Sequence, residues 1–170
     1  MTPTSAALLA MTLSFAVMAA AAAWYVVPWL KVTDSATGLT ALLWFHAFRY
    51  VALQIFSAQQ FGLAVSDAGR NQVAYGDVIA ALLAVSAIFA LRYASRLAVP
   101  ILWLFAAEAA LDLLNSTIVG MREQLLASAS GVTWLILTFY VPMLWVSLAL
   151  LVWQLWLRQW KLTAPQAAKD

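Results

Sequence analysis

The chain has 170 residues, of which 65% are hydrophobic and 9% are charged, and its formal net charge is +2. Soluble domains contain roughly 45–50% apolar and about 25% charged residues, so this composition excludes an ordinary soluble domain. The nine basic residues are scattered along the chain, which excludes a surface that tracks phosphates and therefore nucleic acid as a partner. The absence of cysteine excludes disulfides, thiolate nucleophiles and cysteine-ligated metals.

Long apolar stretches with little sequence between them predict the fold class. A membrane-spanning helix needs roughly 20 predominantly apolar residues, and the mean hydropathy of the chain is +0.89. We therefore predict an all-α membrane protein, a single membrane-embedded domain over residues 1–170 that forms a five-transmembrane-helix bundle in the lipid bilayer. The predicted spans cover about residues 6–30, 38–65, 75–91, 97–119 and 132–157.

The ends of the predicted spans carry sequence signals of their own. Residues 1–23 contain no Lys or Arg and the first apolar stretch is long, so we expect a retained helix rather than a cleavable signal peptide. Polar loops are expected over residues 66–71, after the second span, and over residues 120–131, before the fifth. Pro142 lies mid-way along the fifth span, where it should kink the helix or open a local gap.

The fourth span contains two acidic residues, so its crossing needs independent support, which the distribution of basic residues provides. With five spans, the N-terminus outside and the C-terminus in the cytoplasm, the outer side holds only Arg70 and Arg122. The inner side then collects Lys31, Arg92, Arg96, Arg158, Lys161 and Lys169. This asymmetry follows the positive-inside rule and supports five crossings. Most tryptophans also fall near the predicted inner ends, as expected of membrane-interface anchors: Trp24, Trp29, Trp153, Trp156 and Trp160.

Two predicted spans carry polar residues at helical spacing. In the second span, offsets of three, eleven and fourteen residues place four polar side chains on one helical face: His46, Arg49, Ser57 and Gln60. In the fourth span, offsets of four and seven residues do the same for Glu108, Asp112 and Asn115. Arg49 and Glu108 each lie eleven residues into their span. At about 1.5 Å per residue, both are therefore expected roughly 16 Å deep, near the bilayer middle.

The cost of these buried charges predicts that the two faces meet. Three unpaired charges at that depth would cost on the order of 7–10 kcal/mol, so we expect Arg49 to pair with Glu108 or Asp112. The functional interpretation is a pocket for a small ligand or a proton, formed by His46, Arg49, Gln60, Glu108, Asp112 and Asn115. The alternative is a structural or assembly subunit, in which the ion pair only fixes helix packing.

No motif of a known catalytic chemistry is present. His46 is the only histidine and cannot supply two axial haem ligands, so no cofactor and no metal is predicted. Asp77 is expected in the first turn of the third span, near the surface, where it complements the helix dipole. An intramembrane aspartyl protease would need Asp77 and Asp112 to face each other, which that position does not favour. Without a nucleophile–base pair, the sequence predicts no enzyme.

Four short motifs carry a resemblance to other membrane proteins. They are His-Ala-Phe-Arg at residues 46–49, Ala-Tyr-Gly-Asp at 74–77, Asp-Leu-Leu at 112–114 and Tyr-Val-Pro at 140–142. With these motifs the chain resembles a group of small bacterial multi-pass membrane proteins without an assigned function. The resemblance implies a location in the bacterial inner membrane and no known activity.

Overall fold

The chain folds into antiparallel helices joined by short connections. The computed structural model describes residues 2–93 and 96–163, with the backbone alone over 158–163, and the described part contains helices and no strand. Five helical segments are long and apolar enough to cross a membrane: Pro3–Val32, Ser35–Gln60, Asp67–Arg92, Ala98–Arg122 and Gly131–Leu157. The predictions of an all-helical chain and of five long apolar helices are confirmed. The predicted position of Lys169 lies outside the described residues, and only the backbone of Arg158 and Lys161 is described.

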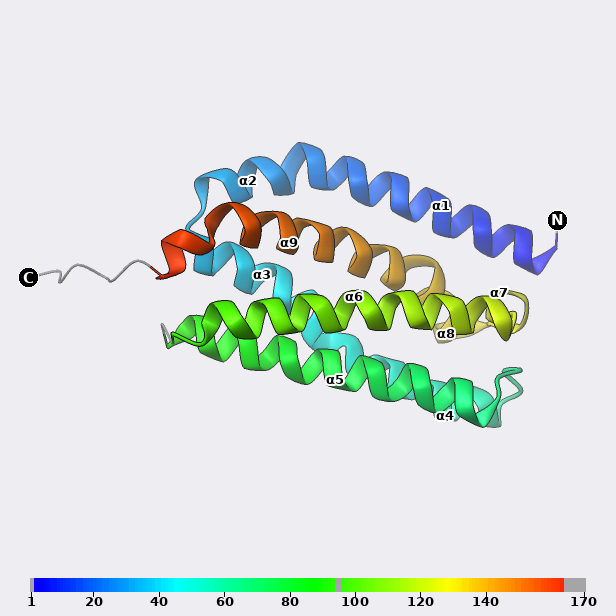
Figure 1. The fold of residues 1–170 in the computed structure, drawn as a ribbon. Helices are drawn as coiled ribbons and strands as arrows, with labels where there is room; N and C mark the ends of the chain where they lie inside the picture. The colour runs from blue at the N-terminus through cyan, green and yellow to red at the C-terminus, as the bar shows by residue number, and fades with distance from the viewer. Residues whose placement is uncertain (1, 94–95, 164–170) are drawn as a thin grey trace, which may run out of the picture.

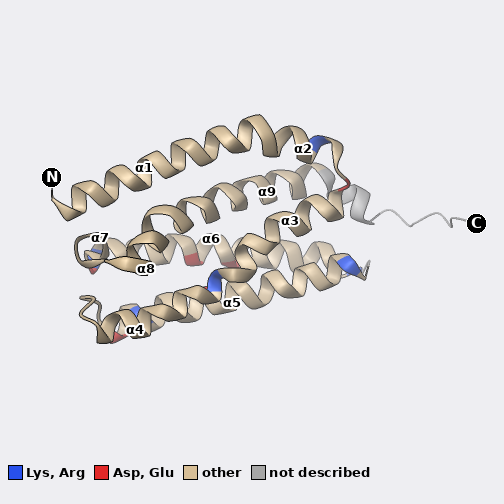
Figure 2. Cartoon of the chain, turned by 180° about the vertical axis from the view of Figure 1, so that it is seen from behind, with Lys and Arg blue, Asp and Glu red and all other residues tan. Residues whose placement is uncertain are grey.

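Consecutive long helices run in opposite directions (Figure 1). The first consists of α1 (Pro3–Ala21), η1 (Ala22–Val26) and α2 (Val27–Val32). The second consists of α3 (Ser35–Ala47), η2 (Phe48–Leu53) and α4 (Gln54–Gln60), and the third and fourth are α5 (Asp67–Arg92) and α6 (Ala98–Arg122). The short α7 (Leu125–Ser128) leads to the fifth, which consists of α8 (Gly131–Leu135), η3 (Ile136–Tyr140) and α9 (Val141–Thr163). Figure 2 shows Lys, Arg, Asp and Glu mainly toward the ends of the helices, with a few about half-way along.

Two of the long helices contain a π-helical turn just before a proline. The turn η1 ends two residues before Pro28, and η3 ends two residues before Pro142. Proline has no N–H to donate to the carbonyl four residues earlier and its ring crowds that carbonyl, so the helix widens locally. The irregularity expected at Pro142 is therefore present, in the form of this π-helical turn.

The main core lies between α3, α5, α6 and α9. The α5 and α6 helices bury many small side chains, which let their backbones approach closely: Ala74, Ala80, Ala81, Ala84, Ala87 and Ala90 on α5, and Ala98, Ala106 and Ala109 on α6. By contrast, α1 packs against α9, η3 and α7. Only 11% of the apolar 18-residue stretch of the first long helix is buried. The first long helix is therefore peripheral to a four-helix core.

Two predicted helix boundaries differ from the structure. The second long helix ends at Gln60 rather than near residue 65, and α5 begins at Asp67, inside the segment that was expected to be a polar loop. The reason is an N-terminal cap, because the Ser66 hydroxyl accepts a hydrogen bond from the Gly69 N–H at 3.0 Å. Asp67 in the first turn also complements the helix dipole. The polar residues of this segment thus start a helix instead of preventing one.

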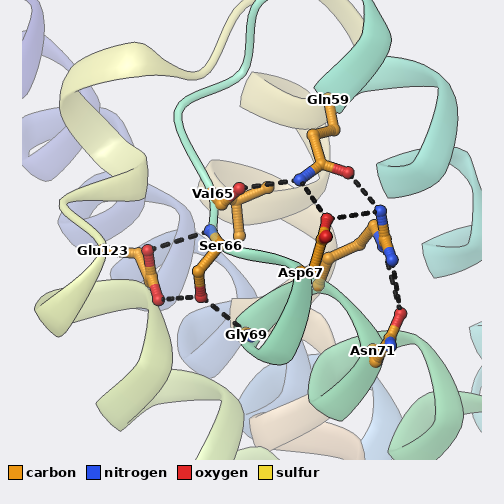
Figure 3. Close-up of polar contacts among 8 residues, drawn as sticks. Gln59, Val65, Ser66, Asp67, Gly69, Asn71 and Glu123 are labelled. Carbon is orange, nitrogen blue, oxygen red and sulfur yellow. Dashed lines mark hydrogen bonds and ion pairs between the residues drawn. The ribbon is translucent and has the colours of Figure 1, made fainter.

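A polar latch joins this helix start to the end of α6 (Figure 3). The Ser66 hydroxyl donates to Glu123 Oε1 at 2.6 Å, and the Ser66 backbone N–H donates to Glu123 Oε2 at 3.1 Å. The approach is close, since a Cβ at Gly69 would lie 2.9 Å from Glu123 Oε1. Beside the latch, Arg70 donates to the side-chain oxygen of Gln59 and so ties α4 to α5.

The latch predicts a pH dependence. The hydrogen bonds from the Ser66 hydroxyl and N–H lower the pKa of Glu123 from its usual 4.5. Because the folded-state pKa is the lower one, the ionised contact stabilises the fold above about pH 4.5 and is lost as the pH falls through the lowered pKa. We expect Glu123→Gln to lower the thermal midpoint at pH 7 and to have a shrinking effect in acid, measured by thermal unfolding in detergent. The exposed neighbour provides the control, since Arg122→Gln should have an effect that does not change over this range. A constant effect of Glu123→Gln across the range would contradict the assignment.

Candidate functional site

Arg49 is fully buried and joins three of the long helices. It lies in η2, where its Nε donates to Asp77 Oδ1 of α5 at 2.6 Å, and its Nη2 donates to Asp112 Oδ2 of α6. Hydrogen bonds between charged partners are roughly twice as strong as neutral ones, and paired carboxylates offset part of the cost of burying the guanidinium. We call Arg49, Asp77 and Asp112 the arginine clamp.

The arginine clamp lies between two apolar clusters of unequal size. Along the second long helix, Ala47 belongs to the larger cluster and Ile55 to the smaller one, with Arg49 between them. Along α5, Ala84 belongs to the larger cluster and Ala74 to the smaller one, with Asp77 between them. The charged residues therefore form a polar layer that divides the interior of the bundle.

Gly76 makes room for one of the two carboxylates. An ideal Cβ at this position would lie 1.7 Å from Asp112 Oδ1, far inside van der Waals contact. Any side chain at position 76 would displace the Asp112 carboxylate from its place against Arg49. The α5 helix thus supplies the carboxylate of Asp77, and its preceding residue, Gly76, leaves the space for the carboxylate of Asp112.

Of the two predicted partners of Arg49, Asp112 forms the ion pair, whereas the predicted surface position of Asp77 is wrong. The side chain of Asp77 is 14% exposed and pairs with Arg49, so Asp77 and Asp112 converge on one guanidinium. The error follows from the helix start, since α5 begins at Asp67 and Asp77 lies roughly 15 Å further along the axis at about 1.5 Å per residue. The Ser66–Asp67 cap is the sequence signal that indicates this depth.

Two other predicted site residues lie close to the clamp without joining it. Glu108 is half-buried on α6, and within the described residues no ion pair links it to Arg49. The ring of His46 is fully buried, with Nε2 2.9 Å from the Ser147 hydroxyl of α9 and an edge-on contact to Phe105 at 5.1 Å between centroids. His46 therefore connects α3 to α9 and α6 rather than facing the carboxylates.

Gln60 and Asn115 lie apart from the clamp, contrary to the expected arrangement. Gln60 and Ser57 are exposed, while Asn115 accepts a hydrogen bond from Gln72 at 2.7 Å. The prediction for the second span assumed one continuous α-helix. The six residues of η2 are a 3-10 helix instead. A 3-10 helix turns about 120° per residue against about 100°, so η2 rotates everything after it by roughly 120°.

A pocket of about 620 Å³ lies beside the clamp, with Arg49 and Asp77 in its wall. Its lining comes from all five long helices and from α7 and is mostly apolar. Other polar residues in the wall include Gln54, Ser116, Thr133 and Tyr140. The sequence predicted a polar pocket between the second and fourth spans, whereas this one also involves the first, third and fifth long helices. Within the part of the chain that the structure describes, no cluster of three or more His, Asp or Glu side chains could hold a metal ion.

One comparison with known proteins matches the chain. The model of a family described as a domain of unknown function (DUF8737) matches residues 6–156, a range that includes the arginine clamp and almost all of the pocket wall. No curated protein and no solved structure matches the chain. The geometry of the site is therefore the basis for its function.

The close approach at Gly76 leads to a test of the clamp. Alanine is favoured over glycine inside a helix by about 1 kcal/mol, so Gly76→Ala and Gly120→Ala should gain alike from helix propensity. A Cβ at Gly120 meets nothing within 4 Å, whereas a Cβ at Gly76 meets the Asp112 carboxylate. We expect Gly76→Ala to lower the thermal midpoint of unfolding in detergent and Gly120→Ala to keep or raise it. Equal midpoints for the two variants would mean that the Asp112 contact contributes nothing to stability.

Proposed function

We propose that this chain, which belongs to the DUF8737 family, is a multi-pass membrane protein that binds a small ligand from the lipid phase in the pocket beside the arginine clamp. The observation that carries the proposal is a mostly apolar pocket of about 620 Å³ whose wall contains a fully buried arginine. Ligand sites are typically concave, about 300–1,000 Å³ in volume and largely apolar, with a few convergent polar groups. The pocket has each of these properties.

The surface of the bundle supports the membrane part of the proposal. Large apolar side chains lie exposed along the long helices, among them Leu13, Leu82, Leu104 and Leu111. Such a surface suits hydrocarbon and would expose an extensive apolar area in water. The end of α2 and the end of α5 lie at the opposite end of the bundle from the start of α5 and the end of α6 (Figure 1). The first two contain Lys31 and Arg92 and the last two Arg70 and Arg122, which agrees with a cytoplasmic location of the first pair in the bacterial inner membrane.

The alternative is a structural or assembly subunit in which the buried charges only fix helix packing. The clamp alone is compatible with either function, because its charges are paired within the chain. The pocket favours the binding function, since a bundle selected for packing alone has no need of a large cavity next to the buried charge of Arg49. Ionisable residues inside membrane helices also mark functional sites by default.

Filling the pocket tests the proposal. Gly120 lies in the pocket wall with open space around it, so Gly120→Phe should occupy the pocket without a clash. The probe is 1-acetylpyrene, titrated into phosphatidylcholine nanodiscs and followed by energy transfer from tryptophan. We expect wild-type protein to show saturable binding beyond partition into protein-free nanodiscs, and Gly120→Phe to weaken it at least ten-fold.

The matched control introduces the same side chain on the same helix outside the pocket. Ala107 of α6 is exposed and does not line the pocket, so Ala107→Phe should bind the probe like wild type. Unchanged thermal midpoints would show that both variants fold. Wild type without a saturable component, or equal binding by Gly120→Phe, would overturn the proposal in favour of a packing function.

A further inference from the structure

We infer that the pocket selects an uncharged ligand with a hydrogen-bond-accepting oxygen, such as a ketone or quinone carbonyl on an apolar ring system. The inference rests on the proposed binding function and deepens it by naming the chemical class of the ligand. It depends on two polar atoms of the pocket wall and on the charge balance of the clamp.

Two buried donor groups in the pocket wall have no partner among the described residues. One is Arg49 Nη1, the nitrogen of the guanidinium that neither carboxylate uses, and the other is the Ser116 hydroxyl. Ser116 follows Asp112 by four residues on α6, so it lies one turn further along the same helical face as the residue that holds Arg49. A buried donor without an acceptor costs about 1–3 kcal/mol, and more when it is charged. An oxygen atom of a ligand beside Arg49 and Ser116 would remove this cost.

Three other polar side chains of the pocket wall already have partners within the protein. Gln54 and Thr133 hydrogen-bond to each other at 3.2 Å, and the Tyr140 hydroxyl donates to the Phe45 carbonyl at 2.7 Å. The wall is otherwise mostly apolar. The ligand should therefore have one polar end at Arg49 and an apolar remainder, rather than polar groups distributed over its surface.

The charge balance of the clamp disfavours an anionic ligand. One guanidinium is shared by the Asp77 and Asp112 carboxyl groups, and Asp77 itself lies in the pocket wall. The adjacent guanidinium favours at least one ionised carboxylate. If both carboxyl groups are ionised the clamp has an excess of negative charge, and if one is protonated it is neutral. In neither state is there a surplus positive charge to offset the desolvation of an anion in an apolar pocket. The free Arg49 donor therefore suits a neutral acceptor.

Three probes of nearly equal size and shape test the selectivity in nanodiscs: 1-acetylpyrene, 1-ethylpyrene and pyrene-1-carboxylate. After correction for partition into protein-free nanodiscs, we expect 1-acetylpyrene to bind at least ten-fold more tightly than either of the others. We also expect its carbonyl stretch in the infrared to shift to lower wavenumber on binding, because a hydrogen bond weakens the C=O bond.

Two hydroxyl variants assign the effect to the wall. Ser116→Ala removes the unpartnered hydroxyl and should reduce the affinity for 1-acetylpyrene several-fold, reduce the infrared shift and leave 1-ethylpyrene unaffected. Thr117 also lines the pocket, but its hydroxyl donates to the Leu113 carbonyl at 2.7 Å, so Thr117→Val should preserve the preference for the ketone. The clamp is intact in both variants, so both are expected to fold.

Each outcome has one meaning. Equal binding of the ketone and the hydrocarbon, tighter binding of the carboxylate, or a ketone affinity that Ser116→Ala leaves unchanged would overturn the inference. If the ketone and the hydrocarbon bind equally, or if the carboxylate binds more tightly, the proposed function still holds as long as Gly120→Phe abolishes that binding. Absence of Gly120→Phe-sensitive binding for all three probes would overturn the proposed function itself.

Discussion

The structure depends on the burial of one guanidinium group. Arg49 has no exposed surface, and an arginine left unpaired in such an interior would destabilise the fold by several kcal/mol. Three helices must therefore meet at one point, with Asp77 and Asp112 supplied by α5 and α6. The absence of a side chain at Gly76 allows the Asp112 carboxylate to reach this point while α5 and α6 remain in close contact through their alanines. Close backbone approach and charge pairing thus support each other.

The polar layer made by the clamp gives the two parts of the bundle different characters. On one side, α3, α5, α6 and α9 form the larger apolar cluster, and on the other a smaller cluster leaves space for the pocket. The fifth long helix contributes to that space through η3, the π-helical turn before Pro142, whose residues Ile136, Leu137 and Tyr140 line the pocket. The peripheral α1 helix supplies another part of the wall through Leu8 and Met11. The break in the fifth helix and the cavity therefore coincide.

Hydropathy and the cost of buried charge were enough to predict five long apolar helices, the pairing of Arg49 with a carboxylate of the fourth span and the irregularity near Pro142. They failed where local geometry changes the depth or phase of a helix. Asp77 lies further along its helix than the sequence predicts, because the polar residues after Ser66 indicate a loop, whereas a serine cap starts the helix there. Gln60 lies away from the helical face of Arg49, because periodicity predicts a shared face only within one helix type, and the 3-10 helix η2 rotates the residues that follow it. The pocket depends on packing among segments far apart in the sequence, which no periodicity describes.

The buried charges can both fix helix packing and bind a ligand, because different nitrogens of Arg49 serve the two purposes. Two nitrogens of Arg49 donate to Asp77 and Asp112, so the charge is paired within the chain and the fold does not need a ligand. The third nitrogen, Nη1, is left without a partner in a mostly apolar wall, together with the Ser116 hydroxyl. A site with this division of donors differs from an anion site, where the arginine charge itself is uncompensated. Arg49 Nη1 is therefore a free hydrogen-bond donor in a clamp whose positive charge is already compensated. Such a donor selects a ligand by the position of its acceptor oxygen rather than by its charge.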